Sequence, residues 1–217
     1  MSRLRPHHET EIVSASGPVF DPKDHDLPLD WKRLFKKEGP VEIEVGCGKG
    51  RFLLERAAQY PERCFVGLEY ARAYLETIAK RCSRQGLANV RVSKCEAGEF
   101  FRERIPAASL DAFHLLYPDP WPKKRHHKRR LIQREFLAEL RRVLKPGAEL
   151  NIGTDHEGYF EWMLEHFREW KGTFVLTPRV LAAPKDRRGF QGRTNYEMKY
   201  LKEGRTIYLL TGRRTGF

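Results

Sequence analysis

Three glycines alternate with other residues in Gly46-Cys47-Gly48-Lys49-Gly50, immediately after the predicted strand 41–45. Because glycine lacks a Cβ, a strand-to-helix turn of this kind lets the backbone approach a ligand closely, as nucleotide-type cofactors require. The spacing is one residue shorter than the GxGxxG of dinucleotide sites, which disfavours NAD. The sequence also lacks the GxxxxGK[ST] pattern of a P-loop. The loop therefore predicts a nucleotide-type cofactor of another kind.

An acid stands two residues before this loop. The carboxylate of Glu44 would repel the pyrophosphate of a dinucleotide but attract a cationic ligand. S-adenosylmethionine carries a sulfonium and an ammonium group, so Glu44 together with Gly46, Gly48 and Gly50 predicts a site for this cofactor. The alternative is a surface acid at the end of a strand.

Two further acids follow predicted strands. Glu69 comes after the run 64–68, near the offset of about 20 residues at which an acid bonds ribose hydroxyls in Rossmann-type sites. Its alternative role is to interact with the N-terminus of the next helix, and the two roles are compatible. Glu96 and Ala97 follow the run 90–92, and we expect them near the adenine end of the cofactor.

A stiff acidic loop follows the predicted strand 110–116. Asp119 lies there within Pro118-Asp119-Pro120-Trp121-Pro122, and the prolines fix φ and remove backbone donors. The carboxyl end of this strand is where open α/β sheets bind ligands, so we expect Asp119 to face the methyl group of the cofactor as a catalytic residue. Trp121 offers a face for stacking, or alternatively seals the edge of the core.

A dense basic run comes next. Six of the eight residues from Lys123 to Arg130 are Lys or Arg, in a chain of formal net charge +12, which favours a nucleic acid as partner. We place the run at the start of the following helix, where cations oppose the helix dipole and require a compensating anion. His126 and His127 are assigned to the same patch rather than to a metal. Phosphate contacts are predicted for Lys124, Arg125, Lys128, Arg129 and Arg130.

Short apolar runs that alternate with segments of helical periodicity must position these residues. Strands are predicted at 41–45, 64–68, 90–92, 110–116, 150–152, 174–176 and 206–210. Helices are predicted at 51–59, 72–84 and 159–170, and another follows the helical spacing of Ile132 to Leu144 and stops at Pro146-Gly147. The pattern predicts a doubly wound, mostly parallel α/β domain at residues 40–217. Residues 1–39 are predicted to form an N-terminal extension with one helical turn around Trp31.

The remaining composition disfavours a membrane-spanning protein, a secreted protein and a cysteine-based metal site. No stretch approaches the roughly 20 apolar residues of a membrane span, and the N-terminus lacks the apolar core of a secretory signal. We therefore expect a soluble, cytoplasmic protein without membrane contact. The four cysteines show no CxxC pair, so we expect reduced, buried thiols and no metal site. They are Cys47, Cys64, Cys82 and Cys95.

Together these features resemble a known family, the bacterial tRNA (guanine-N7)-methyltransferases. The resemblance spans about residues 42–197, and the run from Pro118 to Arg130 is its most specific part. It also includes residues 44–50, Thr154-Asp155 and Thr194-Asn195-Tyr196-Glu197. It implies a class I, Rossmann-like methyltransferase fold with seven strands, S-adenosylmethionine as cofactor and tRNA as partner. The implied product is 7-methylguanosine in the variable loop. We expect a monomer or homodimer without an obligate protein partner.

The resemblance also implies roles for individual residues. Cofactor contacts are implied for Glu44, Glu69, Glu96 and Asp119. Substrate contacts are implied for Lys123, Asp155, Thr194, Asn195, Tyr196 and Glu197. Two positions depart from the family, which usually has Asp or Asn where Glu96 stands and more often has Phe where Tyr196 stands.

Three other functions fit part of the pattern. A methyltransferase of exocyclic amino groups has an acid-Pro-Pro-aromatic loop, but here the second proline follows Trp121. A non-catalytic RNA-binding module on the same scaffold would not need Glu44, Glu69 and Asp119. A NAD-dependent dehydrogenase is disfavoured by Glu44 and by the glycine spacing.

Overall fold

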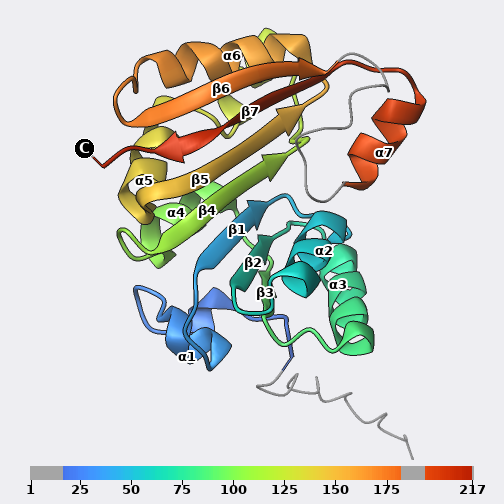
Figure 1. Cartoon of the computed structure of the whole chain (residues 1–217), viewed down its shortest axis with the longest axis vertical. Coiled ribbons are helices and arrows are strands. Elements are labelled where there is room, and N and C mark those ends of the chain that lie inside the picture. The colour runs from blue at the N-terminus through green and yellow to red at the C-terminus, as the bar shows by residue number, and fades with distance from the viewer. Residues whose placement is uncertain (1–16, 182–193, 217) are drawn as a thin grey trace, which may run out of the picture.

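A seven-stranded sheet forms the centre of the molecule in the computed structural model, which describes residues 17–181 and 194–216 (Figure 1). The strand order is β3-β2-β1-β4-β5-β7-β6, and β7 runs antiparallel to both of its neighbours. The strands are β1 (Val41–Val45), β2 (Cys64–Leu68), β3 (Val90–Ser93), β4 (Leu110–Leu116), β5 (Leu144–Thr154), β6 (Phe174–Leu181) and β7 (Ile207–Arg214). The predicted doubly wound, mostly parallel fold is confirmed.

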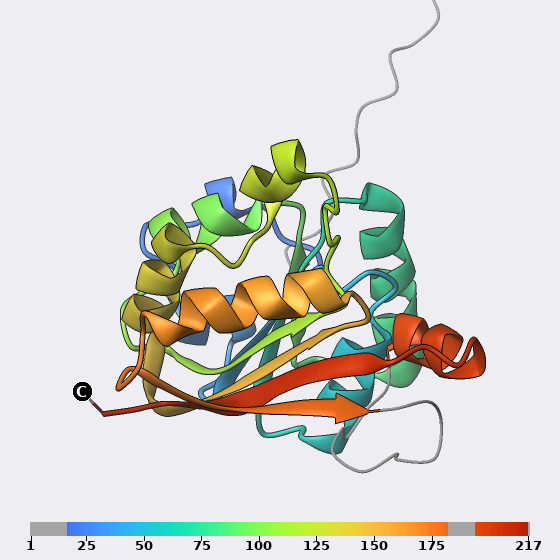
Figure 2. The ribbon, with the colours of Figure 1, turned by 90° about the horizontal axis from the view of Figure 1, so that it is seen from above.

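Helices cover both faces of this sheet (Figure 2). All five residues of β2 are buried, as expected for a parallel strand that is covered on both sides. One face packs against α4 (Ala97–Arg104), α5 (Arg134–Val143) and α6 (Glu157–Arg168). The other packs against α2 (Arg51–Gln59) and α3 (Arg72–Gln85). The order of strands reverses at β1 and β4, where a crevice for ligands is expected.

Several elements differ from their predicted bounds. β5 begins at Leu144 instead of residue 150, because residues around Pro146 and Gly147 form an irregularity in the pairing with β4 rather than an end to it. Two short helices were not predicted at all, α4 and α7 (Asn195–Lys202). Both begin at polar residues whose side chains cap the helix, a signal that apolar periodicity does not detect.

The segment before β1 packs on the same core. It contains the 3-10 turn η1 (Pro22–Asp24) and α1 (Trp31–Phe35), and Leu34 and Phe35 are buried in the main cluster. Val19 also forms a parallel bridge to Val92 at the edge of the sheet. The division of the chain at residue 40 stays a prediction. Among the described helices, none has the length and hydrophobicity to cross a bilayer.

Candidate cofactor and RNA site

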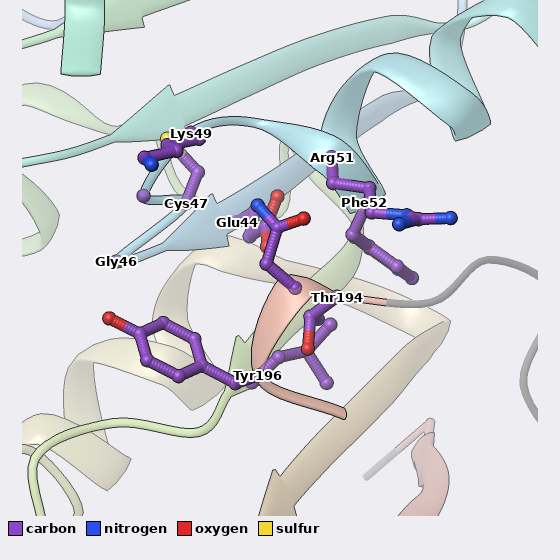
Figure 3. A pocket seen from close by; sticks show the side chains of 11 residues that line it. Glu44, Gly46, Cys47, Lys49, Arg51, Phe52, Thr194 and Tyr196 are labelled. Atoms are coloured by element: carbon purple, nitrogen blue, oxygen red, sulfur yellow. The ribbon is translucent and has the colours of Figure 1, made fainter. Parts of the chain in front are cut away.

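A pocket opens where β1 ends, at the point where the strand order reverses (Figure 3). Its two walls come from distant parts of the chain, the glycine loop with the start of α2 on one side and the start of α7 on the other. It is lined by Glu44, Gly46, Cys47, Gly48, Lys49, Arg51, Phe52, Leu116, Thr194, Asn195 and Tyr196. The structure thus brings three of the predicted substrate residues against the predicted cofactor loop.

The glycine loop adopts a conformation that other residues rarely take. Gly46, Gly48 and Gly50 have φ of 71°, 53° and 70°. Glu69 holds this loop in place, because its carboxylate accepts hydrogen bonds from the backbone N–H of Gly48 at 2.7 Å and of Ala71 at 2.9 Å. The structure thus shows the predicted interaction of Glu69 with the start of α3, and ribose binding by Glu69 stays a prediction.

Glu44 lies on the floor of the pocket and is only 3% exposed. Burial raises the pKa of Glu44 to about 8; the nearby charge of Glu69 adds to this rise, while a bond from the Leu53 backbone opposes it. Its Oε2 atom has no hydrogen-bond partner within the part of the chain that the structure describes. A buried carboxyl group with an open oxygen is costly to ionise alone, and a cationic ligand would remove that cost.

The raised pKa predicts that binding of the cofactor releases a proton. At pH 7 a carboxyl group with a pKa of about 8 is about 90% protonated, and a bound cation favours the ionised form. Calorimetry in buffers of different ionisation heat should detect release approaching one proton per bound S-adenosylmethionine at pH 7. Glu44→Gln, which cannot ionise, should release none. Equal proton release by the two proteins would contradict the assignment of Glu44 to the cationic end of the ligand.

Glu96 stands at the start of a helix. Its carboxylate caps α4 and accepts from the backbone N–H of Gly98 at 2.9 Å and of Glu99 at 2.8 Å. Ala97 is the first residue of that helix. Because both side-chain oxygens already hold the helix end, contact with adenine from this segment would come more readily from its backbone.

The loop after β4 turns sharply. Tyr117 and Trp121 have φ of 56° and 44°, which is rare for residues other than glycine. Asp119 lies between them, is exposed, and is not among the residues that line the pocket. Burial raises the pKa of Tyr196, and the charges of Tyr74, Asp119 and Glu69 add to this rise, so the Asp119 carboxylate lies within electrostatic reach of a residue that lines the pocket.

The basic run forms a separate 3-10 helix, η2 (Lys124–Arg129), rather than the first turn of α5. The prediction that its cations oppose the dipole of α5 is therefore wrong, because residues 130–133 separate the two helices. The exposed members of the run are Lys123, Lys124, Arg125, Lys128 and Arg129. Among the described residues none of these five has a carboxylate partner, so the field they create is not locally neutralised.

Arg130 differs from its basic neighbours, since it is only 3% exposed. Its guanidinium donates to the carbonyl oxygen of Pro120 at 2.9 Å. This burial corrects the prediction of a phosphate contact at Arg130, because its donors face the protein interior instead of solvent.

The remaining predicted substrate residues lie on two elements. Thr194 Oγ1 accepts from the backbone N–H of Glu197 at 2.9 Å, so these two residues together form the start of α7. Asp155 follows β5, is absent from the pocket lining, and pairs with Arg205 at 2.8 Å. The sequence prediction missed Phe52, Arg51 and Leu116, whose apolar or helical context gave no sign of a ligand.

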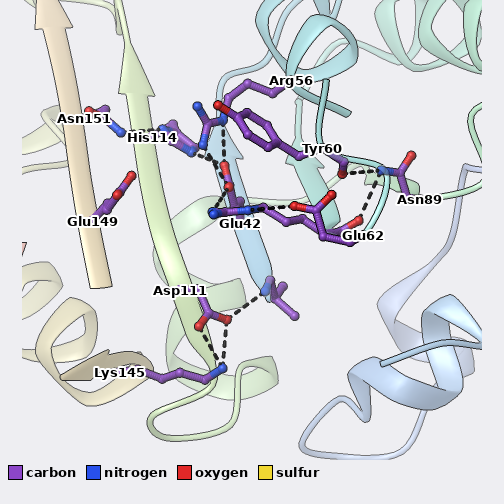
Figure 4. Close-up of polar contacts among 12 residues, drawn as sticks. Glu42, Arg56, Tyr60, Glu62, Asn89, Asp111, His114, Lys145, Glu149 and Asn151 are labelled. Atoms are coloured by element: carbon purple, nitrogen blue, oxygen red, sulfur yellow. Dashed lines mark hydrogen bonds and ion pairs between the residues drawn. The ribbon is translucent and has the colours of Figure 1, made fainter. Parts of the chain in front are cut away.

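A buried charged cluster centres on Glu42 of β1 (Figure 4). Glu42 is fully buried and accepts from Arg56 at 2.7 and 2.9 Å, from Arg63 at 2.8 Å and from His114 at 2.9 Å. Burial alone would raise its pKa, but the bonds from His114 and Arg56 prevail and lower it to about 2. The ring of His114 meets the edge of Phe52 with centroids 4.9 Å apart. The cluster thus ties β1, β4 and α2 together behind the pocket.

Known proteins resemble this chain over most of its length. Residues 38–210 match a family described as "Putative methyltransferase". A tRNA (guanine-N(7)-)-methyltransferase of Geobacter metallireducens is 35% identical over 94% of this chain and 96% of its own length. One of Pseudomonas putida is 38% identical over 88% of this chain and 83% of its own.

Solved structures show the same fold at lower identity. The 16S rRNA methyltransferase KamB superposes with a TM-score of 0.64 at 20% identity, covering 85% of this chain and 92% of that one. A 16S rRNA (adenine(1408)-N(1))-methyltransferase with cosubstrate SAM superposes with a TM-score of 0.57 at 18% identity, covering 90% of this chain and 92% of that one. By its sequence relatives and its fold, the chain belongs to the tRNA (guanine-N7)-methyltransferase family of S-adenosylmethionine-dependent enzymes.

Proposed function

We propose that this protein transfers the methyl group of S-adenosylmethionine to N7 of a guanine in tRNA and so forms 7-methylguanosine in the variable loop. The observation that carries the proposal is the pocket in which Glu44 and the glycine loop meet Thr194, Asn195 and Tyr196. The curated relatives bear the name of this reaction. We further propose that the protein acts in the cytoplasm as a monomer or homodimer.

The pocket fits S-adenosylmethionine, which supplies an electrophilic methyl group when it is bound. The open oxygen of Glu44 would accept from an ammonium group of the ligand. Gly46 and Gly48 leave the adjacent backbone accessible, since a Cβ at either position would meet no heavy atom within 4 Å. Glu69 keeps lone pairs for ribose hydroxyls while it holds the loop, and the segment Glu96-Ala97 would contact adenine.

The reaction requires placement more than proton transfer. Guanine N7 has an exposed lone pair and no proton, so no residue has to act as a general base, and positioning should dominate catalysis. The ring becomes cationic as the methyl group arrives, and a nearby carboxylate would stabilise that charge. Asp119 suits this role better than Asp155, because Asp155 is already paired with Arg205 and Asp119 has no cationic partner among the described residues.

The substrate side of the proposal uses the remaining residues. The start of α7, Thr194 to Glu197, would hold the target base against the cofactor, and Asp155 would support it from β5. Tyr196 is 46% exposed at this edge and offers an aromatic face to a base. Lys123 would contact the nucleotide next to the loop after β4. The exposed phosphate-binding residues would be Lys124, Arg125, Lys128 and Arg129.

Binding of tRNA should depend steeply on salt. If five exposed cations, Lys123 and the four Lys and Arg residues of η2, each contact a phosphate, counterion release gives a slope of about −4 in log K against log salt. Filter binding between 50 and 200 mM salt should then show a loss of affinity of about 10²-fold or more. The double variant Lys124→Ala, Lys128→Ala should reduce the slope by about 2. A slope near zero in the wild type would contradict the electrostatic part of the proposal.

Nucleoside analysis tests the chemistry itself. After incubation with bulk tRNA and S-adenosylmethionine, 7-methylguanosine is expected as the methylated product. An N-methylated exocyclic amino group would instead support the alternative kind of methyltransferase. A protein that binds tRNA without methylating it would support the non-catalytic module.

A further inference from the structure

Among the described residues of the basic run, Arg130 alone is buried. It contacts the loop after β4 that carries Asp119. Its Nε donates to the carbonyl oxygen of Pro120 at 2.9 Å, directly beside Asp119 in the chain. A second guanidinium nitrogen lies 3.4 Å from the carbonyl oxygen of Gly158 in the first turn of α6. One planar group thus connects the loop after β4 with the helix after β5.

The loop after β4 has few backbone N–H groups that could form hydrogen bonds. Pro118, Pro120 and Pro122 have no N–H, so hydrogen bonds to this stretch must be made largely through carbonyl oxygens. Trp121, next to the bonded Pro120, has a φ of 44°, a strained value that persists only when the surroundings impose it. The bond from Arg130 reaches the loop between Asp119 and this strained residue.

The other end of the connection is rigid. The guanidinium carbon of Arg130 lies 4.9 Å from the ring centre of Tyr159 and 5.0 Å from that of Trp162. Tyr159 is fully buried, and Trp162 Nε1 donates to the carbonyl oxygen of Ile132 at 2.7 Å. His166 stacks on Trp162 with ring centres 4.2 Å apart. Arg130 therefore packs on aromatic side chains that are held by contacts outside the loop.

We propose that Arg130 is a positioning residue that ties the loop carrying Asp119 to α6 and sets the place of the Asp119 carboxylate relative to the pocket. It acts on methyl transfer through Asp119 and not through contact with RNA. This inference rests on the proposed function. It divides the basic run into an exposed part that binds phosphate and one buried residue that aligns the reaction.

The test compares Arg130→Gln and Arg130→Lys with Lys128→Gln, which removes an exposed cation from the same run. Arg130→Gln should lower kcat at saturating tRNA by about 10- to 100-fold, because small displacements of reacting groups are costly, while the Kd for tRNA changes less than twofold. Arg130→Lys keeps a donor and the charge but not the planar guanidinium, so its kcat should lie between that of the wild type and that of Arg130→Gln. Lys128→Gln should act mainly on the Kd for tRNA.

Hydrogen exchange supplies a measurement that does not depend on activity. In Arg130→Gln the amides of peptides that cover residues 114–131 should exchange faster, while those of β1 and β2 stay as in the wild type. Thermal melting shows which variants are folded, and if Arg130→Gln is not, Arg130→Lys carries the comparison. Arg168→Gln, which removes an exposed cation from the last turn of α6, controls for a general loss of charge.

Two outcomes would overturn the inference. In the first, Arg130→Gln weakens tRNA binding as Lys128→Gln does and keeps its kcat, which would make Arg130 a phosphate contact after all. In the second, the Arg130 variants are folded with wild-type kcat and wild-type exchange in the loop. A wild-type protein that forms no 7-methylguanosine would refute the proposed function instead, and the exchange experiment would still decide whether Arg130 holds the loop.

Discussion

We expect Asp119→Ala to lower kcat for tRNA methylation by about 10²- to 10³-fold while the Kd for tRNA stays within about twofold. Removal of one preorganised electrostatic group from an active site typically costs this much. Asp119 is exposed, its charge helps to raise the pKa of the pocket residue Tyr196, and the structure gives it no cationic partner among the described residues. Its charge is therefore available to a guanine ring that becomes cationic.

Single-turnover methylation and filter binding on the same tRNA separate the two effects. Asp119→Asn keeps the size of the side chain without its charge, so it should lose most of the rate that Asp119→Ala loses. Asp26→Ala, which removes an exposed acid near α1, serves as the matched control. Equal losses of rate and of tRNA affinity in Asp119→Ala would indicate a structural role for the loop instead of an electrostatic one.

The second large effect concerns stability. Glu42→Ala should lower the free energy of unfolding by about 3–5 kcal/mol, because it leaves the buried cation of Arg56 without its partner. The bonds that lower the pKa of Glu42 to about 2 give a contribution that is present above a pH of about 4.5 and is lost as the pH falls through about 2. The difference between the two proteins should therefore shrink in acid.

Urea unfolding at pH 7 and at pH 3 measures this difference. Glu55→Ala removes an exposed carboxylate that pairs with Arg51 one helical turn away, and it should cost less than about 1 kcal/mol. A cost of similar size for Glu42→Ala would contradict the assignment of the buried cluster as the main polar tie between β1, β4 and α2.

The sequence predicted the elements whose signals are local. β1 follows from five residues in which β-branched apolar side chains alternate with acids, and β2 follows from a mostly apolar run of five. Glu44 with the glycines follows from a spacing of a few positions. These features needed no knowledge of distant contacts. The carboxyl ends of parallel strands meet at one edge, so the fold then places Glu44, Glu69 and Asp119 at the same end of the sheet.

Features set by long-range contacts escaped prediction. Arg130 has the same residue type as its exposed neighbours, and only the packing of α6, about 30 positions later in the chain, makes it a buried residue. The placement of Thr194 in the same pocket as Glu44 likewise depends on the tertiary fold, because the two residues are far apart in the sequence. The two backbone partners of the Glu96 carboxylate at the start of α4 also escaped prediction, and its contact with the cofactor stays a prediction.

Mapping the methylated position on a single tRNA transcript tests the central claim most directly. The wild-type protein with labelled S-adenosylmethionine should place one methyl group on N7 of a guanine in the variable loop, and a transcript with that guanine replaced by adenine should accept none. Asp119→Ala should bind the same transcript with near wild-type affinity and label it at least about 100-fold more slowly. Label on an exocyclic amino group, or a rate that Asp119→Ala leaves unchanged, would contradict the account.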